Sequence, residues 1–180
     1  RRQRQMCIRD RGEAAGGPGT VASVEIYNGT SWTETTDIPT VTQEMAGWGI
    51  QTSGAIVGGS VDSDPTMKNT TVEWDGTSWS AGGNYSRNNK YFQAFGTSVS
   101  SGLAAGGENP GESPARLSIA AVYDGTSWSE VAELSSARYG TAGGGTTTSG
   151  LISGGETAPT TVASTEEWTV PEVNSTITVS

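Results

Sequence analysis

The residues that could carry out chemistry in this chain are few and of restricted types. The sequence contains no histidine and one cysteine, Cys7, so neither a Ser-His-Asp nor a Cys-His arrangement can be assembled from it. Transition-metal centres are built largely from the same two residue types. We therefore predict that the chain is not an enzyme and has no catalytic residue, no metal and no cofactor.

Carboxylates are the remaining reactive groups, and two local arrangements of them need to be weighed. Asp62-Ser63-Asp64 is oxygen-rich, as Ca²⁺ sites are, but it supplies too few ligands by itself. Glu166 and Glu167 are adjacent in a predicted strand, so their side chains point to opposite faces and cannot flank a cleft as the paired acids of glycoside hydrolysis do. We interpret these two glutamates as a solvated strand edge.

Side chains suited to recognising a sugar or a protein collect in loops. Flat rings can stack on a ligand, while amides and guanidinium groups bond to hydroxyls or carboxylates. The candidate ligand-binding residues are Asp62, Asp64, Lys68, Asn69, Tyr85, Arg87, Asn88, Tyr91, Asn109 and Arg116. The alternative is an ordinary set of polar loops, with Tyr91 buried against its own sheet.

The segments that carry these loops repeat along the chain with a period of about 48 residues. A small apolar run that ends in two glycines starts at residues 52, 100 and 148, and the motif Gly-Thr-Ser-Trp starts at residues 29, 76 and 125. Self-similarity at this period is the signature of a repeat architecture. The most variable loop in length is the one after the glycine pair, and such loops often form the binding face.

Each repeat predicts four short strands and no helix. Apolar residues never follow helical spacing, and β-type runs alternate with turn residues. The first strand is expected at 91–95 or 139–142, the second before the glycine pair, the third up to an aromatic (Tyr27, Trp74, Tyr123, Trp168), and the fourth from the Trp of Gly-Thr-Ser-Trp. The Asn-Gly or Asp-Gly dipeptide between the third and fourth strands predicts a tight hairpin. Four such strands in about 50 residues are typical of a propeller blade.

With these motifs the chain resembles the kelch-repeat β-propeller family, in which an aromatic residue is followed by a tryptophan five to six residues later. The matching positions are Gly16, Gly17, Gly58, Gly59, Gly106, Gly107, Gly154, Gly155, Trp32, Trp79 and Trp128. The resemblance implies an all-β propeller of four-stranded antiparallel blades, here an incomplete ring of about 3.5 repeats, with the tryptophans in the core between neighbouring sheets. The basic residue that follows the fourth strand in that family corresponds to Arg138 and Lys90, whereas Thr42 takes its place in the first repeat.

Residues 1–11 do not follow the repeat. Met6-Cys7-Ile8-Arg9-Asp10-Arg11 resembles the translation of a transposase adapter used to prepare sequencing libraries. We predict that residues 1–11 are a non-native assembly scar on a metagenomic sequence. The partial propeller is then expected over 12–180, with repeats at about 12–51, 52–99, 100–147 and 148–180.

The charge of the chain limits its partners. The net charge is −9, and half of the ten lysines and arginines lie within 1–11, so the repeats themselves are more acidic still. An acidic surface repels phosphate backbones and anionic membranes, which predicts no nucleic-acid partner and no membrane insertion. An incomplete ring exposes open blade edges, through which the chain can form oligomers.

The favoured function is a non-enzymatic structural and binding module. Blades rich in Gly, Ser and Thr with Gly-Thr-Ser-Trp hairpins are similar to kelch-type repeats in tail or fibre proteins of marine bacteriophages. That resemblance implies a virion protein that contacts host-surface glycans or proteins, or other fibre subunits. Two alternatives remain open at this point: a secreted or cell-surface bacterial adhesion protein, and the propeller part of a carbohydrate-active enzyme whose catalytic residues lie in other blades.

Overall fold

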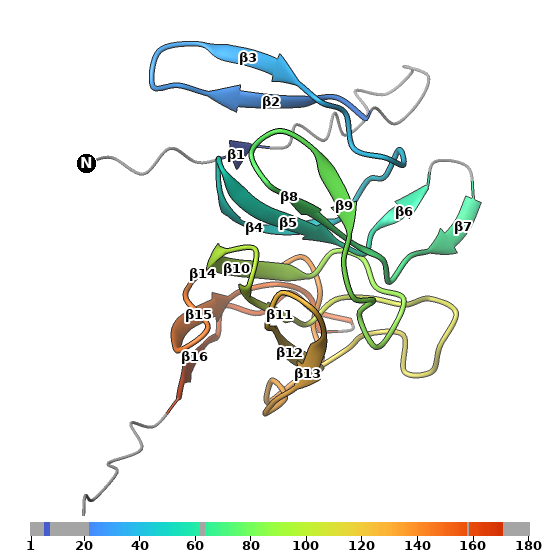
Figure 1. Cartoon of the computed structure of the whole chain (residues 1–180). Coiled ribbons are helices and arrows are strands. Elements are labelled where there is room, and N and C mark those ends of the chain that lie inside the picture. Colours follow the sequence, from blue (N-terminus) through green and yellow to red (C-terminus); the bar gives the residue numbers. More distant parts are fainter. Residues whose placement is uncertain (1–5, 8–21, 62–63, 158, 171–180) are drawn as a thin grey trace, which may run out of the picture.

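The computed structural model describes residues 6–7, 22–61, 64–157 and 159–170, and within these ranges the chain is all-β, with no helix. The strands form blades that follow one another in chain order (Figure 1). The second blade contains β4 (Ala46–Ile50), β5 (Ser53–Val57), β8 (Thr71–Trp74) and β9 (Trp79–Ala81). The third contains β10 (Gln93–Ser98), β11 (Ser101–Ala105), β12 (Ala120–Tyr123) and β13 (Trp128–Glu130). Both are four-stranded and antiparallel, which confirms the predicted partial propeller.

The blades at the two ends have three described strands each. The first contains β1 (Met6–Cys7), β2 (Val24–Tyr27) and β3 (Trp32–Thr35). The fourth contains β14 (Ala142–Gly145), β15 (Ser149–Ser153) and β16 (Thr165–Thr169). A small hairpin, β6 (Ser60–Val61) with β7 (Asp64–Met67), extends from the second blade between β5 and β8.

In the first blade, β1 pairs with β2. The repeat predicts that the run 12–17 would lie beside β2 instead. Gly16 and Gly17 of that run lie outside the described residues. The interpretation of 1–11 as an assembly scar stays a prediction.

The first strands of the blades lie side by side on the inside of the fold, because β10 contacts both β4 and β14. Trp48 of β4 reaches the next blade and lies against Gly102 of β11, where an added Cβ would come within 2.3 Å of the indole. Phe95 of β10 lies in the same way against Gly150, at 2.4 Å. The glycine two residues after the repeat starts at 100 and 148 is therefore required by close packing between blades.

The third and fourth strands are joined by the predicted tight hairpins. In each one the Asn or Asp side chain accepts the backbone N–H groups of the next Thr and Ser, as Asp75 does from Thr77 and Ser78 at 2.8 Å. The glycine between them has φ between 94° and 101° in the three turns. The aromatic at the end of the third strand faces the Trp that begins the fourth, as in the pairs Tyr27–Trp32 and Trp74–Trp79.

The glycine pairs after the second strand lie where two blades approach each other. Gly59 has φ 90°, its N–H donates to the Asn89 carbonyl at 2.8 Å, and an added Cβ would lie 2.4 Å from the Gln43 carbonyl. Gly107 repeats this contact with the carbonyl of Arg138 at 2.8 Å. The other described glycines of these pairs, Gly58, Gly106, Gly154 and Gly155, also have positive φ.

Two of the three repeated tryptophans fill the space between blades, but the third does not. Trp128 and Trp79 pack against buried clusters shared with the preceding blade. The expectation that Trp32 belongs to the core is wrong, because its side chain is 44% exposed. Trp32 would pack against a preceding blade, as Trp79 and Trp128 do, but the described residues contain no blade before the first one.

The structure also corrects which residue of the third repeat corresponds to Arg138, the basic residue that follows the fourth strand in the kelch-repeat pattern. The bridges Gln43–Ser60, Lys90–Glu108 and Tyr139–Glu156 occupy one position in successive blades. The residues just before them are Thr42, Asn89 and Arg138, so Asn89, and not Lys90, is the counterpart of Arg138. Asn89 is fully buried and donates its amide to the Gly106 carbonyl at 2.9 Å.

Candidate binding site

The most unusual backbone in the chain lies just before the first strand of each blade. Glu44 has φ 61° and Tyr91 has φ 55°, and they are the two described non-glycine residues with positive φ. The corresponding residue of the next blade is Gly140, with φ 64°. A side chain in this left-handed region costs about 1–2 kcal/mol that glycine does not incur. The first strands were predicted at 91–95 and 139–142, but β10 and β14 begin two or three residues later, at 93 and 142. The reason is that Tyr91 and Gly140 adopt the left-handed conformation.

These three residues are linked from blade to blade through their backbones. The N–H of Tyr91 donates to the carbonyl of Glu44 at 3.1 Å, and the N–H of Gly140 donates to the carbonyl of Tyr91 at 2.8 Å. Successive blades therefore present the same backbone position along one inner edge of the fold.

Charged and aromatic side chains gather around this edge. The Tyr91 hydroxyl donates to Glu44, and the Lys90 ammonium lies 3.3 Å from the other Glu44 oxygen and 4.7 Å from the Tyr91 ring centroid. The Tyr91 ring lies 5.9 Å from that of Tyr139 in the next blade. Tyr91 remains 38% exposed, so its ring is available to a ligand.

Arg116 and Glu156 complete the group. The Arg116 guanidinium lies 2.8 Å from a Glu156 oxygen and 5.2 Å from the Tyr139 ring centroid. We call Glu44, Lys90, Tyr91, Arg116, Tyr139 and Glu156 the Tyr91 cluster. It combines an exposed aromatic face with ionised donors and acceptors, which suits binding of a hydroxyl-rich ligand.

The acid–base properties of the Tyr91 cluster fit binding better than proton transfer. Hydrogen bonding to Glu44 raises the pKa of Tyr91 to about 12, and hydrogen bonding to Glu156 raises the pKa of Tyr139. Burial opposes ionisation of Glu44, but hydrogen bonds from Tyr91, Ser60 and Lys90 outweigh it and lower its pKa. Hydrogen bonds from Tyr139 and Arg116 likewise lower the pKa of Glu156. Neither Glu44 nor Glu156 is therefore held protonated, as a general acid would need to be.

The Tyr91–Glu44 hydrogen bond predicts a measurable pH dependence. The folded pKa of Tyr91, about 12, exceeds its ordinary value of 10.0, so its stabilising contribution is complete below pH 10 and declines as the pH rises toward 12. Urea unfolding of wild type and Tyr91→Phe should give a constant difference in free energy from pH 7 to 10 and a smaller one above pH 10. Glu44→Gln should lower the pKa of Tyr91 in a tyrosinate titration at 295 nm. A difference that does not change up to pH 11.5 would contradict the assignment.

The predicted ligand-binding residues divide into groups. Tyr91 and Arg116 are brought together, joined through Tyr139. Tyr85 was predicted wrongly, because it is 1% exposed, stacks on Phe92 and meets Trp128 edge-on in the core.

Asn109 is also structural. It is 5% exposed, donates to Glu112 at 2.9 Å and accepts the N–H of Gly111 at 3.0 Å, so it shapes its own loop. Asn69 has a similar role, since its amide donates to the Tyr85 carbonyl at 3.1 Å.

The other candidates lie at the periphery. Arg87 pairs with Glu112 at 2.8 Å on the surface, and Asn88 beside it is exposed. Lys68 lies 3.3 Å from the Thr42 hydroxyl, and burial lowers its pKa. Asp62 and the side chain of Asp64 lie outside the described residues.

The sequence reasoning missed Glu44, Lys90, Tyr139 and Glu156. Their shared position is visible only in the structure, where Gln43, Lys90 and Tyr139 each form a bridge to the residue directly after a glycine pair. In the described part of the chain, no group of three or more His, Cys, Asp or Glu residues is arranged to hold a metal ion. No helix able to cross a membrane is found in that part either.

Comparisons with known proteins show the fold. No family model matches the chain, and no curated protein matches it. Among solved structures, the chain is similar to YjhT, a kelch-repeat propeller protein, with a TM-score of 0.69 and 19% identity over 84% of this chain. The match covers 50% of the YjhT chain, so this sequence spans about half the length of that structure. The blades therefore form a partial, kelch-like propeller.

Proposed function

We propose that the chain is a non-enzymatic structural and binding module that recognises host-surface glycans or proteins, and that its binding surface is the Tyr91 cluster. The observation that carries the proposal is the left-handed backbone of Glu44 and Tyr91. The chain accommodates glycine at the same position, as Gly140 shows, yet two blades keep a bulky side chain there. Strained residues of this kind collect at ligand-binding sites.

The chemistry of the cluster favours a glycan. The exposed Tyr91 ring offers a flat apolar surface for the C–H face of a sugar, and the flanking carboxylates and cations can bond to its hydroxyls. The fold supports this use, because every member of the cluster sits beside a backbone bridge or a loop held by the blades. Similarity of the repeats to tail and fibre proteins of marine bacteriophages extends the proposal to a virion surface, where the partners would be host glycans or proteins and other fibre subunits.

The test separates binding from stability. Tyr91→Gly removes the ring and also relieves the backbone strain, so the free energy of unfolding should change by no more than about 1 kcal/mol. Binding to an array of bacterial lipopolysaccharide and capsule glycans should fall at least about tenfold, as expected for a central aromatic anchor. Tyr27→Ala is the matched control, since Tyr27 is 37% exposed and lies in the first blade away from the cluster.

Two results would contradict the proposal. Glycan binding that Tyr91→Gly leaves intact would place the site elsewhere. Wild-type protein that binds neither these glycans nor host-cell envelope proteins would remove the recognition role altogether.

A further inference from the structure

Glu108 lies between the two cations of the Tyr91 cluster. Its backbone N–H donates to the Lys90 carbonyl at 2.9 Å, and its carbonyl accepts the N–H of Lys90 at 3.1 Å. On its other side it forms an antiparallel bridge to Arg116. Residues directly opposite each other in an antiparallel ladder carry their side chains on the same face. The side chains of Lys90, Glu108 and Arg116 therefore share one face of this short ladder.

Both cations pair with carboxylates of the neighbouring blades and not with Glu108. The Lys90 ammonium lies 3.3 Å from Glu44 of the preceding blade. The Arg116 guanidinium lies 2.8 Å from Glu156 of the next blade. Among the described residues, the Glu108 carboxylate has no ion pair and no hydrogen bond to another side chain. Glu108 therefore keeps its charge available to a ligand.

This arrangement gives the site an excess of negative charge. Glu108 adds a third carboxylate to the two ion pairs of the Tyr91 cluster. An anionic ligand would find both cations already paired and would be repelled by Glu108. The net charge of the chain, −9, acts in the same direction over a longer range. The electrostatics of the site therefore favour a ligand with a positive charge.

The unpaired carboxylate lies close to the two tyrosines of the cluster. Hydrogen bonds to the neighbouring carboxylates are the first cause of the raised pKa values of Tyr91 and Tyr139, and the negative charge of Glu108 adds to both. The two rings are 5.9 Å apart, and Tyr91 is exposed. Such a site suits a small ammonium group, because ring faces attract a cation while the carboxylate accepts its N–H groups.

We infer that the glycan bound at the Tyr91 cluster carries a free amino group, so that the ligand is an amino sugar with a protonated, unacetylated amine. The ammonium would donate to Glu108, and the sugar ring would lie on the exposed face of Tyr91. Hydroxyls on either side would bond to the two ion pairs of the cluster. Neutral sugars would bind more weakly, and acidic sugars would bind least. This inference rests on the function proposed for the cluster.

A lysine side chain of a protein is a poorer occupant than an amino sugar. Its ammonium could pair with Glu108, but it has three donors and no acceptor. It therefore offers nothing to the cations Lys90 and Arg116, which lie on the same face of the ladder. A sugar hydroxyl both donates and accepts, so a single amino sugar can bond to the carboxylates and to the cations of the site.

Two tetrasaccharides with the same β-1,4 linkage test the charge of the ligand. The glucosamine tetramer has an amine where cellotetraose has a hydroxyl. At pH 6 we expect the full chain to bind the glucosamine tetramer at least about tenfold more tightly in isothermal titration calorimetry, as for a hydrogen bond to a charged group. Glu108→Gln should reduce this preference to less than about twofold, because the amide carries no charge. Added salt should weaken binding of the glucosamine tetramer more than that of cellotetraose.

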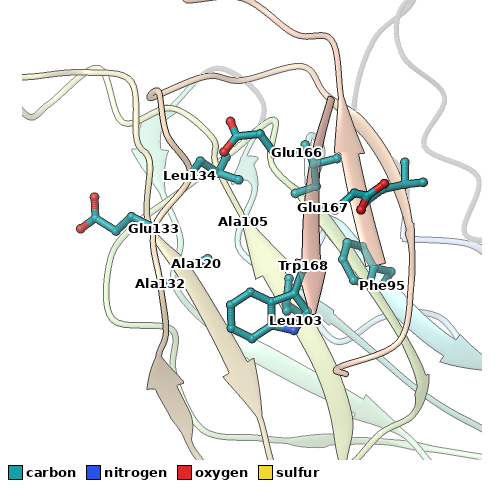
Figure 2. Close-up of a pocket in the computed structure, with 12 residues that line it drawn as sticks. Phe95, Leu103, Ala105, Ala120, Ala132, Glu133, Leu134, Glu166, Glu167 and Trp168 are labelled. Atoms are coloured by element: carbon teal, nitrogen blue, oxygen red, sulfur yellow. The ribbon is translucent and has the colours of Figure 1, made fainter. Parts of the chain in front are cut away.

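Glu167→Gln is the matched control, because it removes the same charge from an exposed position. Glu167 belongs to β16, which holds no member of the Tyr91 cluster, and it lines a pocket between the third and fourth blades (Figure 2). This variant should keep the full preference for the glucosamine tetramer. A preference lost equally in both variants would show that the net charge of the chain, and not Glu108, attracts the amine.

Further results would also overturn the inference. Equal binding of the two tetrasaccharides that Tyr91→Gly abolishes would leave the proposed function in place without a preference for an amine. A preference that survives Glu108→Gln would assign the amine to another group. Tighter binding of tetralysine than of the glucosamine tetramer, with the same dependence on Glu108, would place a protein ligand in the site. If the glucosamine tetramer does not bind at millimolar concentration, the inference fails, and the proposed function then depends on the glycan array alone.

Discussion

Replacing Trp128 with alanine should lower the free energy of unfolding by about 3 kcal/mol, the lower end of the range for deleting a large aromatic side chain, because Trp128 is partly buried between two blades. Trp128 contacts the rings of Trp48, Tyr85 and Tyr123 and makes hydrogen bonds to the second blade. Its loss would open a cavity between two blades and leave the Thr71 hydroxyl, to which it donates, without this partner. Urea unfolding at pH 7, followed by far-ultraviolet circular dichroism, measures the change.

Trp32→Ala is the matched control, because Trp32 occupies the same place in the Gly-Thr-Ser-Trp motif but is 44% exposed. Its loss should cost less than about 1 kcal/mol, since it removes a contact with Tyr27 and little buried surface. Equal costs at the two positions would show that burial between blades is not what makes Trp128 important.

Arg138→Met should destabilise the protein by about 3 kcal/mol, as expected when one partner of a buried ion pair is removed. The Arg138 side chain is 1% exposed and pairs with Glu166, which is 23% exposed. Its guanidinium also donates to the carbonyls of Gly154 and Ser164 at 3.3 and 3.2 Å, and to the Ser136 hydroxyl at 2.8 Å. Arg138 thus ties the connection between the third and fourth blades to strands β15 and β16.

The control for Arg138 is Arg87→Met. Arg87 pairs with Glu112 at the same kind of distance, 2.8 Å, but the two side chains are 51% and 38% exposed, so its loss should cost less than about 1 kcal/mol. Adding Glu166→Gln to Arg138→Met should recover part of the stability, because it removes the uncompensated charge. A double variant that is less stable than Arg138→Met would contradict this explanation.

The repeat could be read from the sequence because its signals are local. The turn Asp75-Gly76-Thr77-Ser78 closes within four residues, and the strands on either side of it need only period-two patterning. Such features are decided by neighbouring residues, so the strands, hairpins and propeller blades were all predictable.

The candidate site could not be predicted in the same way. Tyr91 meets Glu44 across 47 residues and Tyr139 across the next blade, and neither contact has a signal along the chain. Tyr85 and Tyr91 are six residues apart in one connection, yet the first is buried in the core and the second is exposed. Their composition suggested one ligand-binding loop, whereas packing between blades separated them.

The all-β repeat, the hairpin turns and the spacing of the blades follow from local residues, because backbone conformation there depends on glycine, Asn or Asp and alternating side chains. The packing of the blades established that Trp128 is partly buried while Trp32 is exposed, and that Glu166 pairs with the buried Arg138 instead of lying on a solvated edge. Identical motifs differ in this way because burial depends on which blade lies beside them. That neighbour is about one repeat away in the sequence, beyond the reach of any local pattern.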